Sequence, residues 1–157
     1  MVQTDKVLEF DKVKEKWIEL ALTEWAKEKI KDTVPIMSEN ELIARQRETS
    51  EARELLEKSG NPPLVSLNGI RECIQTAAKG DCLSISQLED MEKSLVAVMR
   101  LKNYLSRCKQ WEISLAYYDE NLDCLDNLKE TIRMQIRNGR IDDNASKDLK
   151  SLRDNIE

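Results

Sequence analysis

The chain has 157 residues, enough for one domain with a core of its own. Charged residues make up 35 % of it and aromatic residues only 4 %, with four glycines and three prolines. This composition favours an all-helical protein, because helix formers dominate and turn residues are scarce. The formal net charge of −5 excludes a chain that is basic throughout and holds nucleic acid by overall charge.

The residues available for metal or redox chemistry are few. There is no histidine, and the four cysteines are Cys73, Cys82, Cys108 and Cys124. No two of them form a C-x-x-C pair, which argues against a zinc site. Cys73 falls on an apolar helical face and is expected to be a small buried hydrophobe. No stretch resembles a signal peptide or an uncharged run of ~20 residues that would span a bilayer. We therefore expect free thiols in a reducing cytoplasm and no membrane contact.

The first predicted helical region covers about residues 8–32. Apolar residues supply one side of it: Leu8, Val13, Trp17, Leu20 and Leu22. Thr23 precedes Glu24, and a threonine hydroxyl accepts well from the free N–H groups that open a helix. We therefore expect a break near Thr23 and a second helix after it. Pro35 ends the region, because proline disfavours helix in the residue before it.

The next helix is predicted from Ser38 to about Lys58. Ser38 and Glu41 have the spacing of a capping box, in which each side chain satisfies a backbone N–H group. The inward face is predicted to comprise Leu42, Ile43, Thr49, Ala52, Leu55 and Leu56. Gly60 suits the position after the helix, and the GNPPL loop of residues 60–64 is rigid because its two prolines fix the backbone.

The best-patterned segment follows a short helix over about residues 68–78. The short helix is closed by Gly80 and has an apolar face of Ile70, Cys73, Ile74 and Ala77. Ser86 and Glu89 match a second capping box, which predicts a helix to about residue 108. Its stripe has helical spacing throughout: Leu88, Met91, Leu95, Val98, Leu101, Leu105 and Cys108.

The rest of the chain is predicted to form shorter elements. A looser helix covers about residues 111–118, and another covers about 122–137 with an inward face of Leu125, Leu128, Ile132 and Ile136. Asn138–Gly139 is typical of a tight turn. No pair of strands with alternating apolar residues is evident. We therefore predict a multi-helix, all-α domain with short connections.

The segment SKDLKSLRDNIE, residues 146–157, predicts the opening of a final amphipathic helix. Ser146 suits the N-cap, and Asp148 places a carboxylate in the first turn, where the helix dipole favours it. Apolar residues recur four, three and four residues apart: Ala145, Leu149, Leu152 and Ile156. No glycine or proline closes the helix. Two interpretations stay open: a frayed helix packed on the domain, or a helix that continues in a longer protein.

No signature of catalysis is present. The chain lacks a phosphate-cradling G-x-x-x-x-G-K-[ST] loop, a G-x-S-x-G elbow and a histidine base. Acidic pairs such as Asp142–Asp143 are expected to be caps and solvated faces, because two carboxylates alone specify no reaction. Trp17, Trp25 and Trp111 are expected to be core or interface anchors. We predict a non-catalytic helical module with no catalytic, cofactor-binding or metal-binding residues.

Basic residues gather in two places. One helix carries Arg100, Lys102, Arg107 and Lys109, and another carries Arg133, Arg137 and Arg140. Side chains aligned in this way would meet phosphates. We favour a solvated face, since acids are interspersed and no aromatic platform accompanies them. The second group is kept as the candidate nucleic-acid contact.

Several segments, in order, resemble the type-2 branch of the MutS family, a bacterial MutS paralogue without the mismatch-reading front domain. They cover nearly the whole chain: LEFDKVKEKW (8–17), ETSEARELL (48–56), GNPPL (60–64), AAKGDCLSISQLEDMEKSL (77–95), RLKNYL (100–105) and IRNGRIDDNASKDLKSLRDNIE (136–157). The resemblance implies a helical core at residues 1–145 and, at residues 146–157, the root of a long lever helix cut short. Leu149, Leu152 and Ile156 are expected to seat that helix.

The resemblance also implies what an intact parent would contain. In that family the lever runs to a DNA-embracing clamp and the chain returns to a dimeric ATPase that uses ATP and Mg; the type-2 branch adds a C-terminal Smr nuclease domain. The expected partners are the remainder of the MutS-type chain, a second copy and DNA, with roles in DNA repair and suppression of recombination. Some members are linked to stalled ribosomes. The alternatives are a stand-alone helical adaptor for protein partners and a direct nucleic-acid binder.

Overall fold

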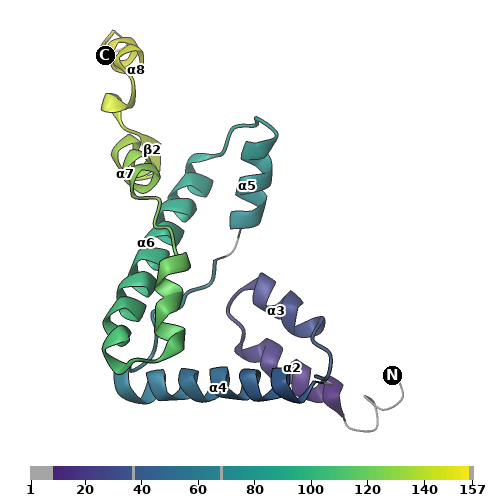
Figure 1. Ribbon diagram of the computed structural model, residues 1–157. Coiled ribbons are helices and arrows are strands. Elements are labelled where there is room, and N and C mark those ends of the chain that lie inside the picture. The colour runs from purple at the N-terminus through teal and green to yellow at the C-terminus, as the bar shows by residue number, and fades with distance from the viewer. Residues whose placement is uncertain (1–8, 37, 68, 156–157) are drawn as a thin grey trace. The chain divides into compact units, whose positions relative to one another are not determined.

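The computed structural model describes residues 9–36, 38–67 and 69–155 (Figure 1). Helices account for most of this part of the chain, which confirms the predicted all-α class. The chain divides into two compact units, Met1–Asn68 and Gly69–Glu157. The separate division predicted after residue 145, between a core and the root of a lever, stays a prediction. No helix in the described ranges is both long and apolar enough to cross a bilayer.

The first unit begins with a helical hairpin. Helices α2 (Phe10–Leu20) and α3 (Glu24–Lys31) pack against each other. Thr23 Oγ1 accepts a hydrogen bond from Ala26 N at 3.1 Å, which confirms the predicted break and cap. Lys14 Nζ donates to the carbonyl of Lys31 at 3.0 Å and thus joins α2 to the end of α3. Leu8, predicted on the apolar side, lies outside the described residues.

The tryptophans of this hairpin are not core residues. Trp17 is 47 % exposed and Trp25 70 % exposed. Trp111, in the second unit, is 38 % exposed. The core interpretation is therefore wrong for all three, and their role as interface anchors stays a prediction. A bulky apolar side chain enters a core only where a second element covers it, which the local spacing of residues does not specify.

Helix α4 (Glu39–Ser59) follows in the same unit, and Gly60 directly follows its last residue, close to the predicted end near Lys58. Ser38 stands at its N-cap but makes no side-chain cap hydrogen bond, so the predicted Ser38–Glu41 capping box is wrong. Ion pairs three or four residues apart support the helix instead: Arg45–Glu48, Arg47–Glu51, Arg53–Glu57 and Lys58–Glu54. The predicted inward face is only partly correct. Leu55 is buried, whereas other members are more than two-fifths exposed: Leu42, Ile43 and Leu56.

The second unit is built around α6 (Ile85–Cys108), its longest helix. Helix α5 (Ile70–Ala78), the 3-10 segment η2 (Ser114–Asn121) and helix α7 (Asp126–Gln135) pack on α6 (Figure 1). The chain turns at a short 3-10 helix, η1 (Lys109–Trp111), and returns along α6 through η2 and then α7. Most buried apolar side chains of the described chain belong to this unit: Cys73, Leu95, Ala97, Tyr104, Cys108, Ile113, Ala116, Cys124 and Ile132.

Two local predictions in this unit need correction. The capping box of α6 is formed by Ser84 and Gln87, not by Ser86 and Glu89: Ser84 Oγ accepts from Gln87 N at 3.2 Å, and Gln87 Oε1 accepts from Ser84 N at 2.8 Å. Both pairs have the required spacing, and the start of the helix at Ile85 selects the first pair. The loose helix expected at residues 111–118 is two 3-10 segments, η1 and η2.

The returning helix α7 is also shorter than predicted and presents a different face. It ends at Gln135, and Ile136 starts a two-residue strand. Leu125 and Leu128, both expected inside, are 47 % and 44 % exposed, while Lys129 is only 6 % exposed. Ile132 is buried as predicted. Leu125 occupies the N-cap with a φ of 43°, so the helix begins too late to place it on the inward face.

A small hairpin follows α7. Strands β1 (Ile136–Arg137) and β2 (Arg140–Ile141) pair antiparallel, with Arg137 opposite Arg140. Asn138 and Gly139 both have positive φ, at 53° and 71°, which is the conformation of a tight two-residue hairpin turn. The predicted turn is confirmed, and it joins a short strand pair that the sequence did not indicate. A ladder of two residues is too short to produce an alternating apolar pattern.

Candidate functional site

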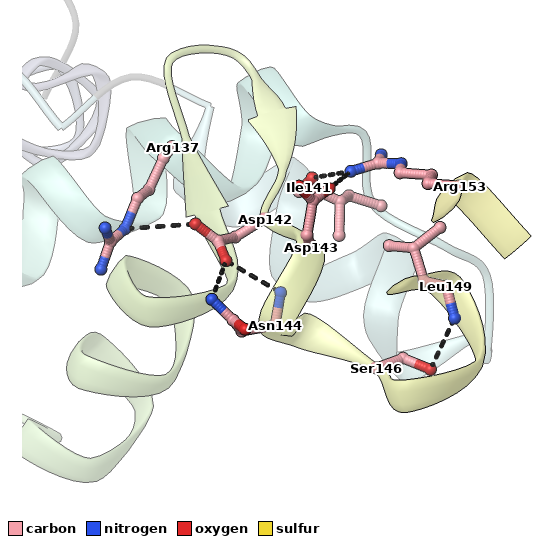
Figure 2. A network of polar contacts seen from close by, with 8 residues as sticks. All are labelled: Arg137, Ile141, Asp142, Asp143, Asn144, Ser146, Leu149 and Arg153. Carbon is pink, nitrogen blue, oxygen red and sulfur yellow. Dashed lines mark hydrogen bonds and ion pairs between the residues drawn. The ribbon is translucent and has the colours of Figure 1, made fainter. Parts of the chain in front are cut away.

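Two of the predicted site residues, Arg137 and Arg140, lie in the segment between α7 and α8 (Lys147–Asp154). Figure 2 shows the polar contacts of this segment. We call residues 136–146 the connector; it holds the hairpin and a short 3-10 helix, η3 (Asp143–Ala145). Asp142 N donates to Gln135 O at 2.8 Å, which fixes the connector to the end of α7. Gly139 N donates to Glu89 Oε1 at 3.0 Å, which fixes the turn to α6. The connector is therefore held to two helices of the unit.

Asp142 organises the inside of the connector. Its Oδ1 accepts from Asn144 N at 2.9 Å and from Asn144 Nδ2 at 3.0 Å, and its Oδ2 lies 3.5 Å from Arg137 Nε. Donation by the Asn144 backbone is the main cause that lowers the pKa of the Asp142 carboxyl; the Asn144 side chain, Arg137 and Arg140 add to it. The half-buried carboxylate is thus kept ionised and shapes the bend that leads into α8.

Helix α8 starts as predicted. Ser146 Oγ accepts from Leu149 N at 3.4 Å, which confirms the predicted N-cap. Near the other end of α8, Arg153 Nη1 donates to the Ile141 carbonyl at 3.0 Å and also pairs with the Asp143 carboxylate. The end of the helix thus reaches back to the connector (Figure 2).

The predicted apolar seam of α8 has little cover in the described part of the chain. Leu149 is half-buried, Leu152 is 62 % exposed, and Ile156 lies outside the described residues. No residue of α8 is buried. The described part of this helix is therefore not packed into a core, and the role of the three residues as the seat of a lever stays a prediction.

The candidate nucleic-acid contacts are partly neutralised by neighbouring acids. Arg133 Nη1 lies 3.9 Å from Glu130 Oε1, and Arg137 pairs with Asp142. Arg140 is exposed, on the strand opposite Arg137. The three arginines therefore come from α7 and both strands of the hairpin, and two of them have a carboxylate within 4 Å. Their contact with nucleic acid stays a prediction.

The other basic group has structural contacts that spacing alone did not reveal. Lys102 Nζ donates to the Leu122 carbonyl at 2.7 Å. Lys109 Nζ forms an ion pair with Asp119 Oδ1 at 2.7 Å and donates to Glu120 Oε1 at 3.0 Å. Proximity to Asp119, and then to Glu120, raises the pKa of Lys109. Lys102 of α6 and Lys109 of η1 contact the returning chain, so the expected solvated face is wrong for them.

Lys129 is a further residue that the sequence did not single out. It is 6 % exposed; its Nζ lies 2.5 Å from Asp126 Oδ1 and 3.5 Å from Met99 Sδ on α6. The hydrogen bond to Asp126 raises the pKa of Lys129. The spacing of three residues between Asp126 and Lys129 was a usable signal for a helical ion pair. Nothing local indicated that the alkyl chain of the lysine would be covered by α6.

The residue types needed for a metal site do not converge in the described chain. No group of three or more cysteine, aspartate or glutamate side chains is placed to hold an ion there. The cysteines are free thiols; three of them, Cys73, Cys108 and Cys124, are buried and Cys82 is exposed. What the described polar residues do provide is hydrogen bonds and ion pairs that hold one helical element to another.

The fold and the connector define an all-helical module with a projecting final helix. No protein-family model and no solved structure matches the chain. Curated proteins named Endonuclease MutS2 do match it: those of Halothermothrix orenii and Clostridium beijerinckii are 34 % and 36 % identical over 94 % of the chain. The protein of the same name from Brevibacillus brevis is 32 % identical over 96 % of the chain.

The chain spans about a fifth of the length of these relatives. It is therefore related to one portion of a MutS2 protein, and the resemblance to MutS-type proteins is confirmed at that level.

Proposed function

We propose that the chain forms the non-catalytic helical core, and the root of a lever helix, of a MutS2-type protein. The observation that carries the proposal is the similarity of 94 % of the chain to one fifth of a MutS2 protein. Two structural features support it. The second unit is a packed base around α6, and α8 leaves that base with its apolar residues largely exposed.

The proposed mechanism is transmission of position. A packed base moves as one body when a distant site changes state, and a helix attached to it converts a small rotation into a larger displacement at its tip. In this account α6 with its returning chain is the base, α8 is the start of the arm, and the connector is the joint between them. Leu149, Leu152 and Ile156 then meet other parts of the parent protein.

The parent is proposed to supply the chemistry that this chain lacks. It would be a DNA-binding ATPase that uses ATP and Mg, acts as a homodimer in the cytoplasm and carries a C-terminal Smr-type endonuclease domain. Its roles would be DNA repair and suppression of recombination, with rescue of stalled ribosomes as a further task. The relatives' name, Endonuclease MutS2, supports the nuclease part of this proposal.

The coding sequence that follows the codon of residue 157 tests this proposal. A G-x-x-x-x-G-K-[ST] loop in the same reading frame is expected, because an ATPase needs backbone N–H groups and a lysine to hold the phosphates. A stop codon directly after residue 157 would contradict the proposal and favour a stand-alone adaptor. The exposed apolar residues of the α2–α3 hairpin favour the adaptor as the second candidate: Val13, Trp17, Leu20, Leu22 and Trp25.

Direct contact of the three arginines with nucleic acid has its own test. Fluorescence anisotropy of a branched DNA at low and raised salt measures binding by the chain. If Arg133 and Arg137 meet phosphates, the double variant Arg133→Glu, Arg137→Glu lowers the affinity and flattens its salt dependence. The matched control, Arg47→Glu, Arg53→Glu on α4, leaves both unchanged. Equal binding by both double variants would remove Arg133 and Arg137 from the nucleic-acid interface.

A further inference from the structure

The Arg153 side chain of α8 contacts residues of the connector that lie ten and twelve positions earlier in the sequence. Arg153 lies near the end of α8, twelve residues after Ile141 and ten after Asp143. It donates to the Ile141 carbonyl at 3.0 Å and pairs with the Asp143 carboxylate (Figure 2). The two acceptors lie at the end of β2 and the start of η3, so one guanidinium spans the bend between hairpin and helix.

The surface that Arg153 contacts is itself fixed. Asp142 lies between the two acceptors. Its carboxylate accepts from the backbone and side-chain amides of Asn144, and its backbone N–H donates to the Gln135 carbonyl. Glu89 of α6 accepts from Gly139 at the tip of the hairpin. A helix attached to Ile141 and Asp143 is thereby attached to α6 and α7, because the backbone of the connector joins these hydrogen bonds to one another.

Little else positions α8 in the described chain. The helix has eight residues, roughly 12 Å, a length that is marginal alone in water. None of its residues is buried, and Leu152 is 62 % exposed. Leu149 is half-buried, and the Ser146 cap acts within the first turn. In the described part of α8, Arg153 supplies the side-chain hydrogen bonds that reach beyond the helix.

We propose that Arg153, the Asp143 carboxylate and the Ile141 carbonyl form a latch that sets the direction in which α8 leaves the connector. With the latch closed, α8 keeps a fixed orientation relative to α6; with it open, α8 changes direction about residues 142–146. The Arg153 and Asp143 side chains are 40 % and 56 % exposed, so salt should weaken the ion pair. Arg153 is thus a positioning residue. The inference goes beyond the proposed function and depends only on contacts within this chain.

Residual dipolar couplings of backbone N–H groups test the latch in the full chain. In the unmodified protein, one alignment tensor is expected to fit the couplings of both α6 and α8. In Arg153→Ala the α8 couplings should shrink by roughly twofold or more, because the helix then averages over orientations. The matched control is Lys150→Ala, an exposed cation on the same helix, which should leave the couplings unchanged.

A second variant separates loss of direction from loss of helix. Asp143→Asn removes the charge of the latch and leaves the sequence of α8 intact, so a smaller fall of the α8 couplings is expected with helical Cα shifts retained. The latch is wrong if the α8 couplings still fit the α6 tensor in both variants, or if they do not fit it in the unmodified protein. Should Arg153→Ala unfold α8, the result for Asp143→Asn decides. None of these results depends on the coding sequence that tests the proposed function.

Discussion

Helices α6 and α8 have similar patterns in sequence and different environments in the structure. Both begin after a serine N-cap and carry apolar residues at helical spacing. Leu95 of α6 is 8 % exposed, whereas Leu152 of α8 is 62 % exposed. Periodicity therefore specifies which residues share a face of a helix. Whether that face is buried depends on what the chain brings against it.

Most of the cover of α6 comes from the chain that turns back after Cys108. Segment η2 and helix α7 pack along α6, and polar contacts hold them there at intervals. Lys109 pairs with Asp119, Lys102 binds the Leu122 carbonyl, and Lys129 reaches Met99. For α8 the packed element in the described chain is the neighbouring η3, joined through Arg153. The base and the arm thus differ in one respect: the chain folds back over α6, and in the described residues it does not fold back over α8.

The largest effect is expected from truncation in the covered helix. Leu95→Ala should lower the free energy of unfolding by about 2–5 kcal/mol, because it removes buried methyl groups and leaves a cavity. Leu152→Ala, the same change on the exposed face of α8, should stay within about 0.5 kcal/mol. Urea denaturation followed by circular dichroism measures both. Similar losses for the two variants would show that α6 and α8 do not differ as described.

The ion pair of Lys109 and Asp119 should contribute next. Lys109→Met keeps most of the side-chain length but leaves the Asp119 carboxylate, which is 5 % exposed, without its cation. Loss of one partner of a buried pair is destabilising, since the remaining charge stays desolvated. The urea midpoint should fall by less than in Leu95→Ala and by more than in the control Glu120→Gln, which removes an exposed charge. Equal midpoints for the two variants would place the pair outside the folded base.

A smaller loss is expected at the tip of the hairpin. Gly139 has a φ of 71°, and an added Cβ would meet no atom within 4 Å. Gly139→Ala should therefore cost about 1 kcal/mol through backbone conformation alone. The amide of residue 139, which donates to Glu89 Oε1, should exchange its hydrogen faster, whereas amides in the centre of α6 should exchange at an unchanged rate. If Gly139→Ala is as stable as the unmodified chain, the described turn is contradicted.

The smallest effect is expected at low pH, where protonation of Asp142 lowers stability. The pKa of Asp142 is lowered in the folded state, so its contribution to stability is present above the unfolded value of about 3.9 and is lost as the pH falls through the folded pKa. The carboxyl carbon shift of Asp142, followed by NMR, should therefore show a midpoint below about 3.9. Asn144→Ala removes one of the two amide donors and should raise the midpoint part of the way. A midpoint above about 3.9 would mean that the connector network does not form.

The sequence predicted the elements that depend on local rules. The break at Thr23, the end of α4 at Gly60, the Asn138–Gly139 turn and the cap at Ser146 were all predicted and are confirmed. Each depends on the conformation of a single residue or on a hydrogen bond within three residues. Local chemistry suffices for these features because no distant segment takes part in them.

Features that depend on distant segments were missed or misplaced. The Lys109–Asp119 and Arg153–Asp143 pairs join residues that are ten positions apart, and no local period marks them. Lys129 is covered by α6, against the usual exposure of lysine. The sequence predicts an irregular connection before Ser146, but not the contacts in it that bring Arg137 and Arg140 near Asp142.

Native-state amide hydrogen exchange tests most directly the claim that α6 belongs to a packed base and α8 to an arm attached at the connector. Amides in the middle of α6 should exchange only through global unfolding, with an opening free energy equal to that from urea denaturation. Amides of α8 should exchange through local opening at a far lower free energy. Equal protection of the two helices would contradict the account, because it would show that α8 is as fully packed as α6.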